Sequence, residues 1–292
     1  MSIVKEIQMS LVLLSLLLPL SFFPAGVSAS QVSRVSYVTF PVSYAEKHWN
    51  IAAKLSFPLQ KSNGAAVLIV HGSGGVDSRG AYHSSTLNRE GFVTLEIDLW
   101  AARGWLGRQF GRPKTVSETL PDAFAALEFL RGLEGVDPER IGLVGFSWGG
   151  VVSMLSRSPL HQRMISTDLS FAAQVAFYPV CWVYNKVPGY ELPELDNTPL
   201  LILTGEKDDY DTATSCSDWR STLGSEDQKN VRVVVYPDAA HGFNTSAAPA
   251  EVTDPFSHLG KGGKVVMKTN NLARELSDKA LSDFFLEHLV RH

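Results

Sequence analysis

The stretch Gly145-Phe-Ser-Trp-Gly-Gly150 decides the fold of this chain. The apolar residues 141–144 precede it and the apolar residues 151–155 follow it, an order that predicts a strand, a sharp turn and a helix. Glycine at either end of the turn lets the backbone pass closely, and Ser147 stands at the apex. The N-terminus of a helix favours developing negative charge. We therefore interpret Ser147 as a nucleophile; the alternative is a solvated serine in a tight turn.

Two later strand patterns end in an acid and in a histidine. Residues 199–204 are apolar and β-branched, and Asp208 follows them. Residues 231–236 form a similar pattern, and His241 follows those. Catalytic side chains in open parallel sheets gather at the carboxyl ends of the strands. The chain therefore offers a serine, a carboxylate and an imidazole in the order of a Ser-Asp-His triad.

Four segments together resemble the dienelactone hydrolase family of the α/β-hydrolase superfamily. They are HGSGG at 71–75, GLVGFSWGG at 142–150, LLILTGEKDD at 200–209 and VYPDAAHGF at 235–243. The resemblance extends over residues 35–290. It implies that Ser147 is the nucleophile, Asp208 the triad acid and His241 the base. The name-giving enzymes carry cysteine where this chain has serine, which points to ordinary serine-ester chemistry rather than to their lactone substrate.

The roles of these residues follow from their chemistry. A serine hydroxyl is a poor nucleophile at neutral pH, so His241 would take its proton and later donate it to the leaving alkoxide. A carboxylate would hold the imidazole in the correct tautomer. Asp209 and Asp211 compete with Asp208 for this role, and we favour Asp208 because its place after Gly-Glu-x matches the family pattern.

The glycine-rich segment His71-Gly-Ser-Gly-Gly75 follows the strand pattern at residues 65–70. Small residues let backbone N–H groups approach a substrate oxygen, and Gly72 is a candidate contact there. In the superfamily that the chain resembles, the oxyanion hole combines an N–H of this loop with the N–H that follows the nucleophile. These would be the main chains of Ser73 and Trp148. A phosphate-binding loop is disfavoured because no Gly-Lys-Ser/Thr follows.

Aromatic residues near the predicted strand ends are candidates for a small substrate cleft. Trp100 and Phe243 are among them, and Arg103 is a candidate anchor for a substrate carboxylate, with a surface arginine as the alternative. The short connections between the motifs leave no room for a large lid domain. We therefore expect a small, soluble ester or lactone. The other candidates for this cleft are Trp105, Trp148, Tyr178 and Trp182.

The N-terminal segment indicates export. Residues 11–23 are almost wholly apolar, Lys5 precedes them, and Val27-Ser-Ala29 provides small residues for cleavage before Ser30. This pattern is typical of a secretory signal peptide over residues 1–29, and the apolar run is short for a membrane span. An uncleaved anchor is the alternative. The expected location of the mature protein is periplasmic or extracellular, off the membrane.

Composition excludes several classes of protein. Of the 292 residues, 45% are apolar, which excludes a disordered chain, and the net charge of −4 argues against nucleic acid or an anionic membrane as partner. Residues 30–292 have the length of one catalytic domain. Strand patterns that alternate with helical ones predict a mostly parallel, doubly wound α/β sheet, preceded by an antiparallel pair at residues 32–42 and 49–57. We expect residues 247–255 to form a surface loop beside the histidine.

The two cysteines of the chain are Cys181 and Cys216. In an exported protein an even pair suggests a disulfide, and each follows a predicted strand end, so the two residues could meet. Two separate thiols are the alternative. No His/Cys/Asp spacing resembles a zinc site, and catalysis by a Ser-His-Asp triad needs no cofactor.

The sequence thus predicts an exported serine hydrolase that cleaves a small carboxylic ester or lactone. A peptidase or amidase is the second reading, because it uses the same triad but must protonate an amine. A non-catalytic binding protein on the same fold is the third. The complete triad and the glycine loop argue against it.

Overall fold

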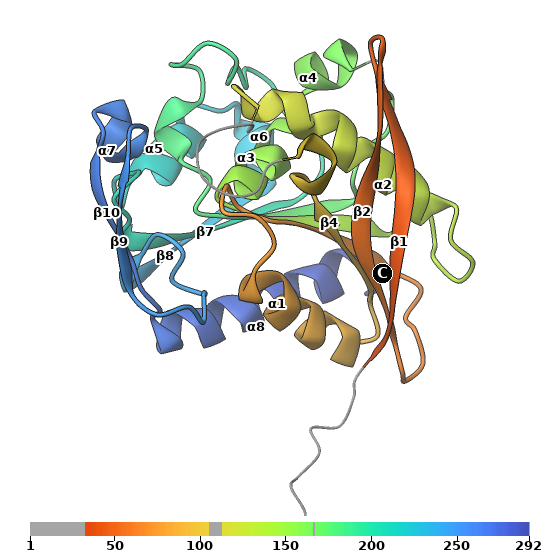
Figure 1. Cartoon of the computed structure of the whole chain (residues 1–292). Helices are drawn as coiled ribbons and strands as arrows, with labels where there is room; N and C mark the ends of the chain where they lie inside the picture. Colours follow the sequence, from red (N-terminus) through yellow and green to blue (C-terminus); the bar gives the residue numbers. More distant parts are fainter. Residues whose placement is uncertain (1–32, 105–112, 166, 292) are drawn as a thin grey trace, which may run out of the picture. The chain divides into compact units, whose positions relative to one another are not determined.

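An eight-stranded sheet forms the centre of the computed structural model, which describes residues 33–104, 113–165 and 167–291 (Figure 1). The strand order is β1-β2-β4-β3-β5-β6-β7-β8. In chain order the strands are β1 (Ser33–Tyr44), β2 (Lys47–Pro58), β3 (Ala66–Val70), β4 (Val93–Asp98), β5 (Ile141–Phe146), β6 (Ala173–Phe177), β7 (Leu200–Lys207) and β8 (Val231–Ala240).

The sheet is antiparallel at one edge and parallel elsewhere. β1 pairs with β2 and β2 with β4 in antiparallel register, whereas β4, β3, β5, β6, β7 and β8 run parallel. The parallel strands bring the segments that follow β5, β7 and β8 to one end of the sheet, where Ser147, Asp208 and His241 lie. The predicted α/β-hydrolase fold, with its mostly parallel sheet, is confirmed.

Helices cover both faces of the sheet. Figure 1 shows α1 (Ser78–Arg89) and α8 (Asn271–Leu289) on one face and α2 (Leu120–Arg131) and α3 (Trp148–Leu155) on the other. Side chains of β3 alternate between the two resulting cores, since Val67 and Ile69 join the first and Leu68 and Val70 the second. The remaining helices are η1 (Ala101–Arg103), η2 (Val116–Thr119), α4 (Pro159–Met164), η3 (Cys181–Val183), α5 (Ser215–Ser221), α6 (Ser225–Lys229) and α7 (Ser257–Gly260).

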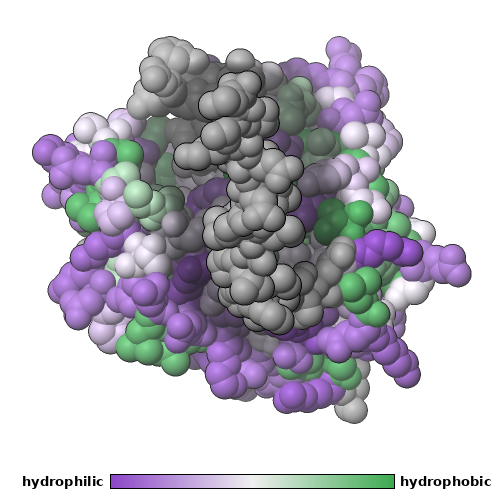
Figure 2. All heavy atoms as spheres, turned by 60° about the horizontal axis from the view of Figure 1, so that its bottom comes forward, coloured by the Kyte–Doolittle hydropathy of each residue, from purple (hydrophilic) through white to green (hydrophobic). Residues whose placement is uncertain are grey.

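The apolar side of α8 explains its place. Asn270 caps its N-terminus by accepting from Ala273 N, and the residues it buries include Leu281 and Phe285. The face around α1 and α8 that Figure 2 brings forward is mainly hydrophilic outside the grey atoms. Among the described residues, no helix has both the length and the apolar character required to cross a membrane.

One loop prediction is wrong. Part of residues 247–255 forms β9 (Ala250–Asp254), which pairs in antiparallel register with β10 (Gly263–Met267). The turn between these strands contains α7. Most of β9 is exposed, and its apolar alternation is limited to Ala250 and Val252, too short a pattern to indicate a strand. The predicted signal peptide, residues 1–29, and Trp105 lie outside the described residues.

Candidate active site

Ser147 stands at a strained turn between β5 and α3. Its φ and ψ are 52° and −108°, a region that residues with side chains rarely adopt. A Cβ at Gly145 would lie 1.9 Å from the carbonyl oxygen of Gly149, and a Cβ at Gly149 would lie 2.1 Å from that of Val70. Both glycines are therefore required by close backbone contacts, which hold the serine clear of the strand.

His241 lies between Ser147 and Asp208. Its Nε2 is 2.9 Å from Ser147 Oγ, and its Nδ1 is 2.9 Å from Asp208 Oδ2 and 3.1 Å from Oδ1. The carboxylate accepts from Nδ1–H, which leaves Nε2 as the acceptor for the serine hydroxyl. Asp208 and His241 are both buried, so water does not weaken their interaction. In this geometry the imidazole can accept the serine proton.

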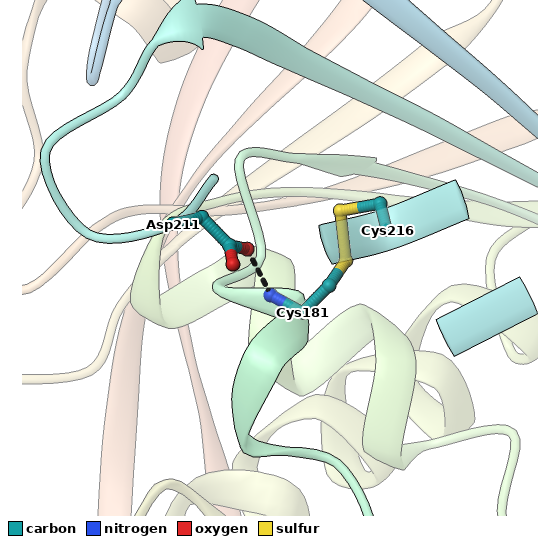
Figure 3. A group of neighbouring side chains, drawn as sticks. All are labelled: Cys181, Asp211 and Cys216. Carbon is teal, nitrogen blue, oxygen red and sulfur yellow. Dashed lines mark hydrogen bonds between the residues drawn. A yellow bond between two sulfur atoms is a disulfide. The ribbon is translucent and has the colours of Figure 1, made fainter. Parts of the chain in front are cut away.

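The two neighbouring acids point elsewhere. Asp209 Oδ2 accepts from Val266 N at 2.8 Å, and Asp211 accepts from the backbone N–H of Cys181. Figure 3 shows the Asp211 carboxylate turned toward Cys181, beside the disulfide. Burial raises the pKa of Asp211 to about 6. Of the three acids considered from the sequence, Asp208 is the one that meets the imidazole.

Cys181 and Cys216 form a disulfide, with their Cα atoms 4.9 Å apart (Figure 3). It joins η3 to α5. Cys181 stands in the chain between Val180 and Trp182, two residues that line the cleft described below. The bridge therefore attaches one wall of that cleft to the helix that follows Asp208.

The glycine loop lies against Ser147. A Cβ at Gly72 would lie 3.5 Å from Ser147 Cβ and 3.2 Å from the carbonyl oxygen of Phe146. Gly75 N donates to Gly72 O at 3.0 Å, which folds the loop back on itself. Ser73 and Trp148, the residues predicted to supply the oxyanion N–H groups, both line the cleft beside Ser147.

His71 supports this loop and does not face the cleft. Leu99 N donates to its Nε2 at 2.9 Å, and its Nδ1 lies 2.7 Å from Gly72 O, an acceptor. One ring nitrogen accepts and the other donates, as in a neutral imidazole. Burial lowers its pKa, in agreement with that state. His71 orients the glycine loop by these bonds.

A cleft of about 680 Å³ opens over Ser147. Three segments outside the sheet supply most of its wall, namely residues 113–116, residues between 180 and 190, and residues between 254 and 260. Trp148 and Trp182, which the sequence suggested for the cleft, line it. The volume lies within the range of small-molecule sites.

Three residues predicted to bind substrate lie elsewhere. Trp100 is 2% exposed and packs between His71 and Trp148, and Phe243 is fully buried beside Tyr178. Both belong to the hydrophobic cores, because large apolar side chains at strand ends are as useful in packing as in a cleft.

Arg103 is also placed away from Ser147. Its Nη2 donates to Asp122 Oδ2 at 2.7 Å, and its guanidinium stacks on Trp49. It lines a separate hollow of about 430 Å³ near the β1–β2 turn. Asp122 is fully buried, and burial raises its pKa to about 6 although Arg103 opposes the shift. Arg103 therefore serves a buried ion pair and not a carboxylate in the cleft over Ser147.

Two tyrosines contact His241. Tyr178 was suggested for the cleft but is buried outside its lining, whereas Tyr210 had no role assigned from the sequence. The ring of Tyr210 lies 4.4 Å from that of His241, and its hydroxyl donates to Asp254 Oδ2 at 2.9 Å. The ring of Tyr178, the residue that follows β6, lies 4.6 Å from the ring of His241. Tyr210 comes two residues after Asp208, and only its nearness to that acid could have drawn attention to it.

Arg79 is another residue that the sequence did not indicate. It is 6% exposed, and its Nε donates to Asp77 Oδ1 at 2.9 Å. Its Nη1 donates to Tyr178 Oη at 3.1 Å, and its Nη2 would lie 3.3 Å from a Cβ at Gly72. The guanidinium thus lies behind the glycine loop and beside the ring that packs on His241. The buried hydrogen-bond chain continues from Tyr178 to Asn244, His83 and Asp278.

The sheet is mostly parallel and flanked by helices, and a serine at a strand-to-helix turn is hydrogen-bonded to a His–Asp pair. These features define the α/β-hydrolase fold. The chain belongs to the dienelactone hydrolase family, whose model matches residues 51–289.

Known proteins similar to this chain differ widely from it in sequence. An uncharacterised protein of Mycobacterium tuberculosis is 29% identical over 187 residues, which are 61% of this chain and 63% of that protein. A putative dienelactone hydrolase from Klebsiella pneumoniae has a similar structure, with a TM-score of 0.62, 18% identity, and coverage of 87% of this chain and 99% of that one. Thermogutta terrifontis esterase 2, solved after phosphorylation by paraoxon, also has a similar structure. Its TM-score is 0.58 and its sequence identity 17%, with coverage of 86% of this chain and 94% of that one.

Proposed function

We propose that this chain is an exported serine hydrolase that cleaves a small carboxylic ester or lactone through an acyl-enzyme. The observation that carries the proposal is the position of His241, whose two ring nitrogens lie 2.9 Å from Ser147 Oγ and from Asp208 Oδ2. Membership of the dienelactone hydrolase family supports the same reaction class.

The first half of the reaction forms the acyl-enzyme. Ser147 Oγ attacks the carbonyl carbon while its proton passes to His241 Nε2, and Asp208 stabilises the resulting imidazolium. The carbonyl oxygen becomes an oxyanion that accepts from the backbone N–H groups of Ser73 and Trp148. One such donor contributes about 3 kcal/mol to stabilisation of the transition state. When the intermediate collapses, the imidazolium gives its proton to the leaving alkoxide.

The second half releases the acid. Water takes the place of the alcohol, loses a proton to His241 Nε2 and attacks the acyl carbon. Collapse of the second intermediate returns the proton to Ser147 Oγ and frees the carboxylic acid. No step needs a metal or a cofactor.

Two alternatives remain distinct from this proposal. An amidase would use the same residues to expel an amine, and an aminoacyl anilide tests for it directly. A binding protein would retain the fold and bind an ester without turnover. The hydrogen-bonded Ser147–His241–Asp208 set supports an enzyme, because a binding protein has no need of a polarised serine.

Export is the second part of the proposal. Residues 1–29 form the signal peptide, and residues 30–292 form one catalytic domain. The Cys181–Cys216 disulfide supports an oxidising compartment, such as the periplasm or the extracellular space. The proposed partner is a small ester or lactone rather than nucleic acid or membrane.

The decisive experiment replaces the serine. Ser147→Ala should lower kcat for a small chromogenic ester by on the order of 10⁴-fold or more, without loss of thermal stability. Because the similar esterase was phosphorylated by paraoxon, a fluorophosphonate should label Ser147 in the parent protein and leave the variant unlabelled. Ser221→Ala, at an exposed serine of α5, is the matched control. It should retain both the ester hydrolysis and the labelling by the fluorophosphonate. Full activity of Ser147→Ala would end the serine-hydrolase proposal.

A further inference from the structure

The cleft over Ser147 is mainly aromatic and aliphatic. Five aromatic side chains line it, from four different parts of the chain, and valines and prolines fill most of the remaining wall. Phe256, at 61% exposed, lies where the cleft meets solvent. The aromatic lining residues are Trp148, Trp182, Tyr190, Tyr210 and Phe256.

Charged groups in the described part of the lining are few. They are Lys114 and Asp254. Asp254 is already engaged by the wall, since Tyr210 Oη donates to its Oδ2 at 2.9 Å and Phe256 N donates to its Oδ1 at 2.8 Å. Lys114 is exposed, and its backbone N donates to Glu118 Oε1 at 2.9 Å, so a carboxylate lies close to its main chain.

Among the described residues, Arg79 and Arg103 do not line the cleft. Arg79 lies behind Gly72 and is bonded to Asp77 and Tyr178. Arg103 is bonded to Asp122 and lines a different hollow. Recognition of a substrate carboxylate inside a cleft requires a cation that is available to pair with it. Each of these guanidiniums already has a carboxylate partner of its own.

We infer that the substrate is an uncharged ester that carries an aromatic ring on its acyl or its alcohol part. This inference rests on the proposed esterase function and adds the substrate class. A carboxylate placed in this cleft would lose hydration against an apolar wall, and Lys114, which is exposed, is the one cation of the described lining that could pair with it. A neutral ring would instead bury apolar area and contact Trp182 and Phe256. A volume of about 680 Å³ leaves room for the ring and the ester together.

The experiment compares esters by hydrolysis in a pH-stat. The substrates are ethyl acetate, ethyl 3-phenylpropanoate, 3-phenylpropyl acetate, and the two phenyl esters with a carboxylate added at the para position of the ring. We expect kcat/KM for one of the neutral phenyl esters to exceed that of its carboxylated counterpart and that of ethyl acetate by about tenfold or more. Equal or higher kcat/KM values for the carboxylated esters would overturn the inference. If the Lys114→Met variant then lost its activity on the carboxylated esters, Lys114 would be identified as their anchor.

Variants then test the wall itself. Phe256→Ala should lower kcat/KM for the preferred phenyl ester by about fivefold, mainly through KM, and leave ethyl acetate within twofold. Val252→Ala, an exposed residue of β9 outside the lining, is the control. An unchanged KM in Phe256→Ala would contradict the placement of the ring. If no ester is hydrolysed and Ser147 is not labelled by a fluorophosphonate, the proposed function itself has failed; hydrolysis of ethyl acetate alone would overturn the substrate class and leave the function standing.

Discussion

The Nη1 of Arg79 donates a hydrogen bond of 3.1 Å to the hydroxyl oxygen of Tyr178. The ring of Tyr178 packs 4.6 Å from that of His241, and its backbone is held at a φ of 39°. Burial raises the pKa of Tyr178 to about 12, although Arg79 opposes the shift, so the phenol stays protonated and donates onward to Asn244. His241, the proposed base, is therefore supported by a neutral ring that a buried guanidinium holds in place.

Removal of the phenol should loosen that support. In Tyr178→Phe we expect kcat to fall about tenfold, which is about 1.4 kcal/mol, while KM stays within twofold, because the ring remains and only its hydrogen bonds are lost. Steady-state kinetics with a small ester measures both values. Tyr37→Phe, at a residue that is 83% exposed, is the control. A variant that loses thermal stability but keeps its kcat would limit Tyr178 to a structural role.

Asp208, the proposed acid, can be distinguished from its acidic neighbours by substitution. Asp208→Asn should lower kcat by about 10⁴-fold, because the amide no longer holds the tautomer of His241. Asp209→Asn should stay within about threefold, since the amide oxygen of asparagine can still accept from Val266 N. The measurement is kcat for the same ester in both purified variants. Severe loss in Asp209→Asn and not in Asp208→Asn would contradict the assignment of the acid.

Loss of the disulfide should lower stability. Cys181 and Cys216 are 35 residues apart, and chain-entropy arithmetic gives roughly 3–4 kcal/mol for a loop of that length. For a chain of this size we expect Tm to fall by about 10 °C in the double variant Cys181→Ala/Cys216→Ala, measured by calorimetry. Alkylation of the unreduced parent protein followed by mass spectrometry is the check on the bridge. Two alkylated thiols in protein taken from its oxidising compartment would refute it.

Glu96 gives the stability a dependence on pH. It lies on β4 at 5% exposure, and burial raises its pKa to about 7 from 4.5. Between these two values the folded chain keeps a proton that the unfolded chain has released, so stability falls as pH rises toward and through 7. Above pH 7 the free energy of unfolding is about 3 kcal/mol lower than it is below pH 4.5, through this group alone.

Glu96→Gln removes this titration with little change of shape. The difference in unfolding free energy between variant and parent, from urea titrations, should grow in favour of the variant by about 2–3 kcal/mol from pH 5 to pH 8. A Cβ at Gly80 would lie 1.7 Å from Glu96 Oε1, so a larger residue at position 80 is no substitute for this test. A difference that is the same at both pH values would show that Glu96 titrates normally.

Processing of the N-terminus is open to direct measurement. The mature protein should begin at Ser30 or within a few residues of it, because Val27-Ser-Ala29 follows the apolar run. Terminal sequencing by mass spectrometry of protein from the exported fraction gives the answer. Recovery of the full-length chain from the cytosol would contradict export.

The strands and the proximity of Ser147, Asp208 and His241 were predictable for a simple physical reason. Parallel strands buried on both faces are near-continuous apolar runs, as in β3 and β5, and such runs are easy to recognise. Their carboxyl ends meet at one edge of the sheet, so residues that follow them converge although they lie far apart in the chain. This convergence is what brought Ser147, Asp208 and His241 together.

The walls of the cleft were harder to predict, because loops have no periodicity that reports which side chains face inward. Trp100 and Phe243 follow strand ends in the same way as Trp148, yet the first two are core residues. Arg79 occurs in a helix rich in serine and arginine and would pass for a surface residue. Its burial depends on Tyr178, 99 residues later in the chain. Contacts of that kind exist only after the sheet has formed.

The β9–β10 hairpin is a site at which the substrate specificity could be changed. It is fastened to the loop after β7 at two points, since Asp209 O accepts from His258 N at 2.7 Å and Asp209 Oδ2 accepts from Val266 N at 2.8 Å. Its tip, residues 254–260, contributes to the cleft, whereas the triad lies on other segments. A chimaera could therefore exchange that tip for one of another length and chemistry while the fastening through Val266, which lies outside the tip, is kept. Selection for new esters is best directed at these few positions, which can vary without rebuilding the catalytic machinery.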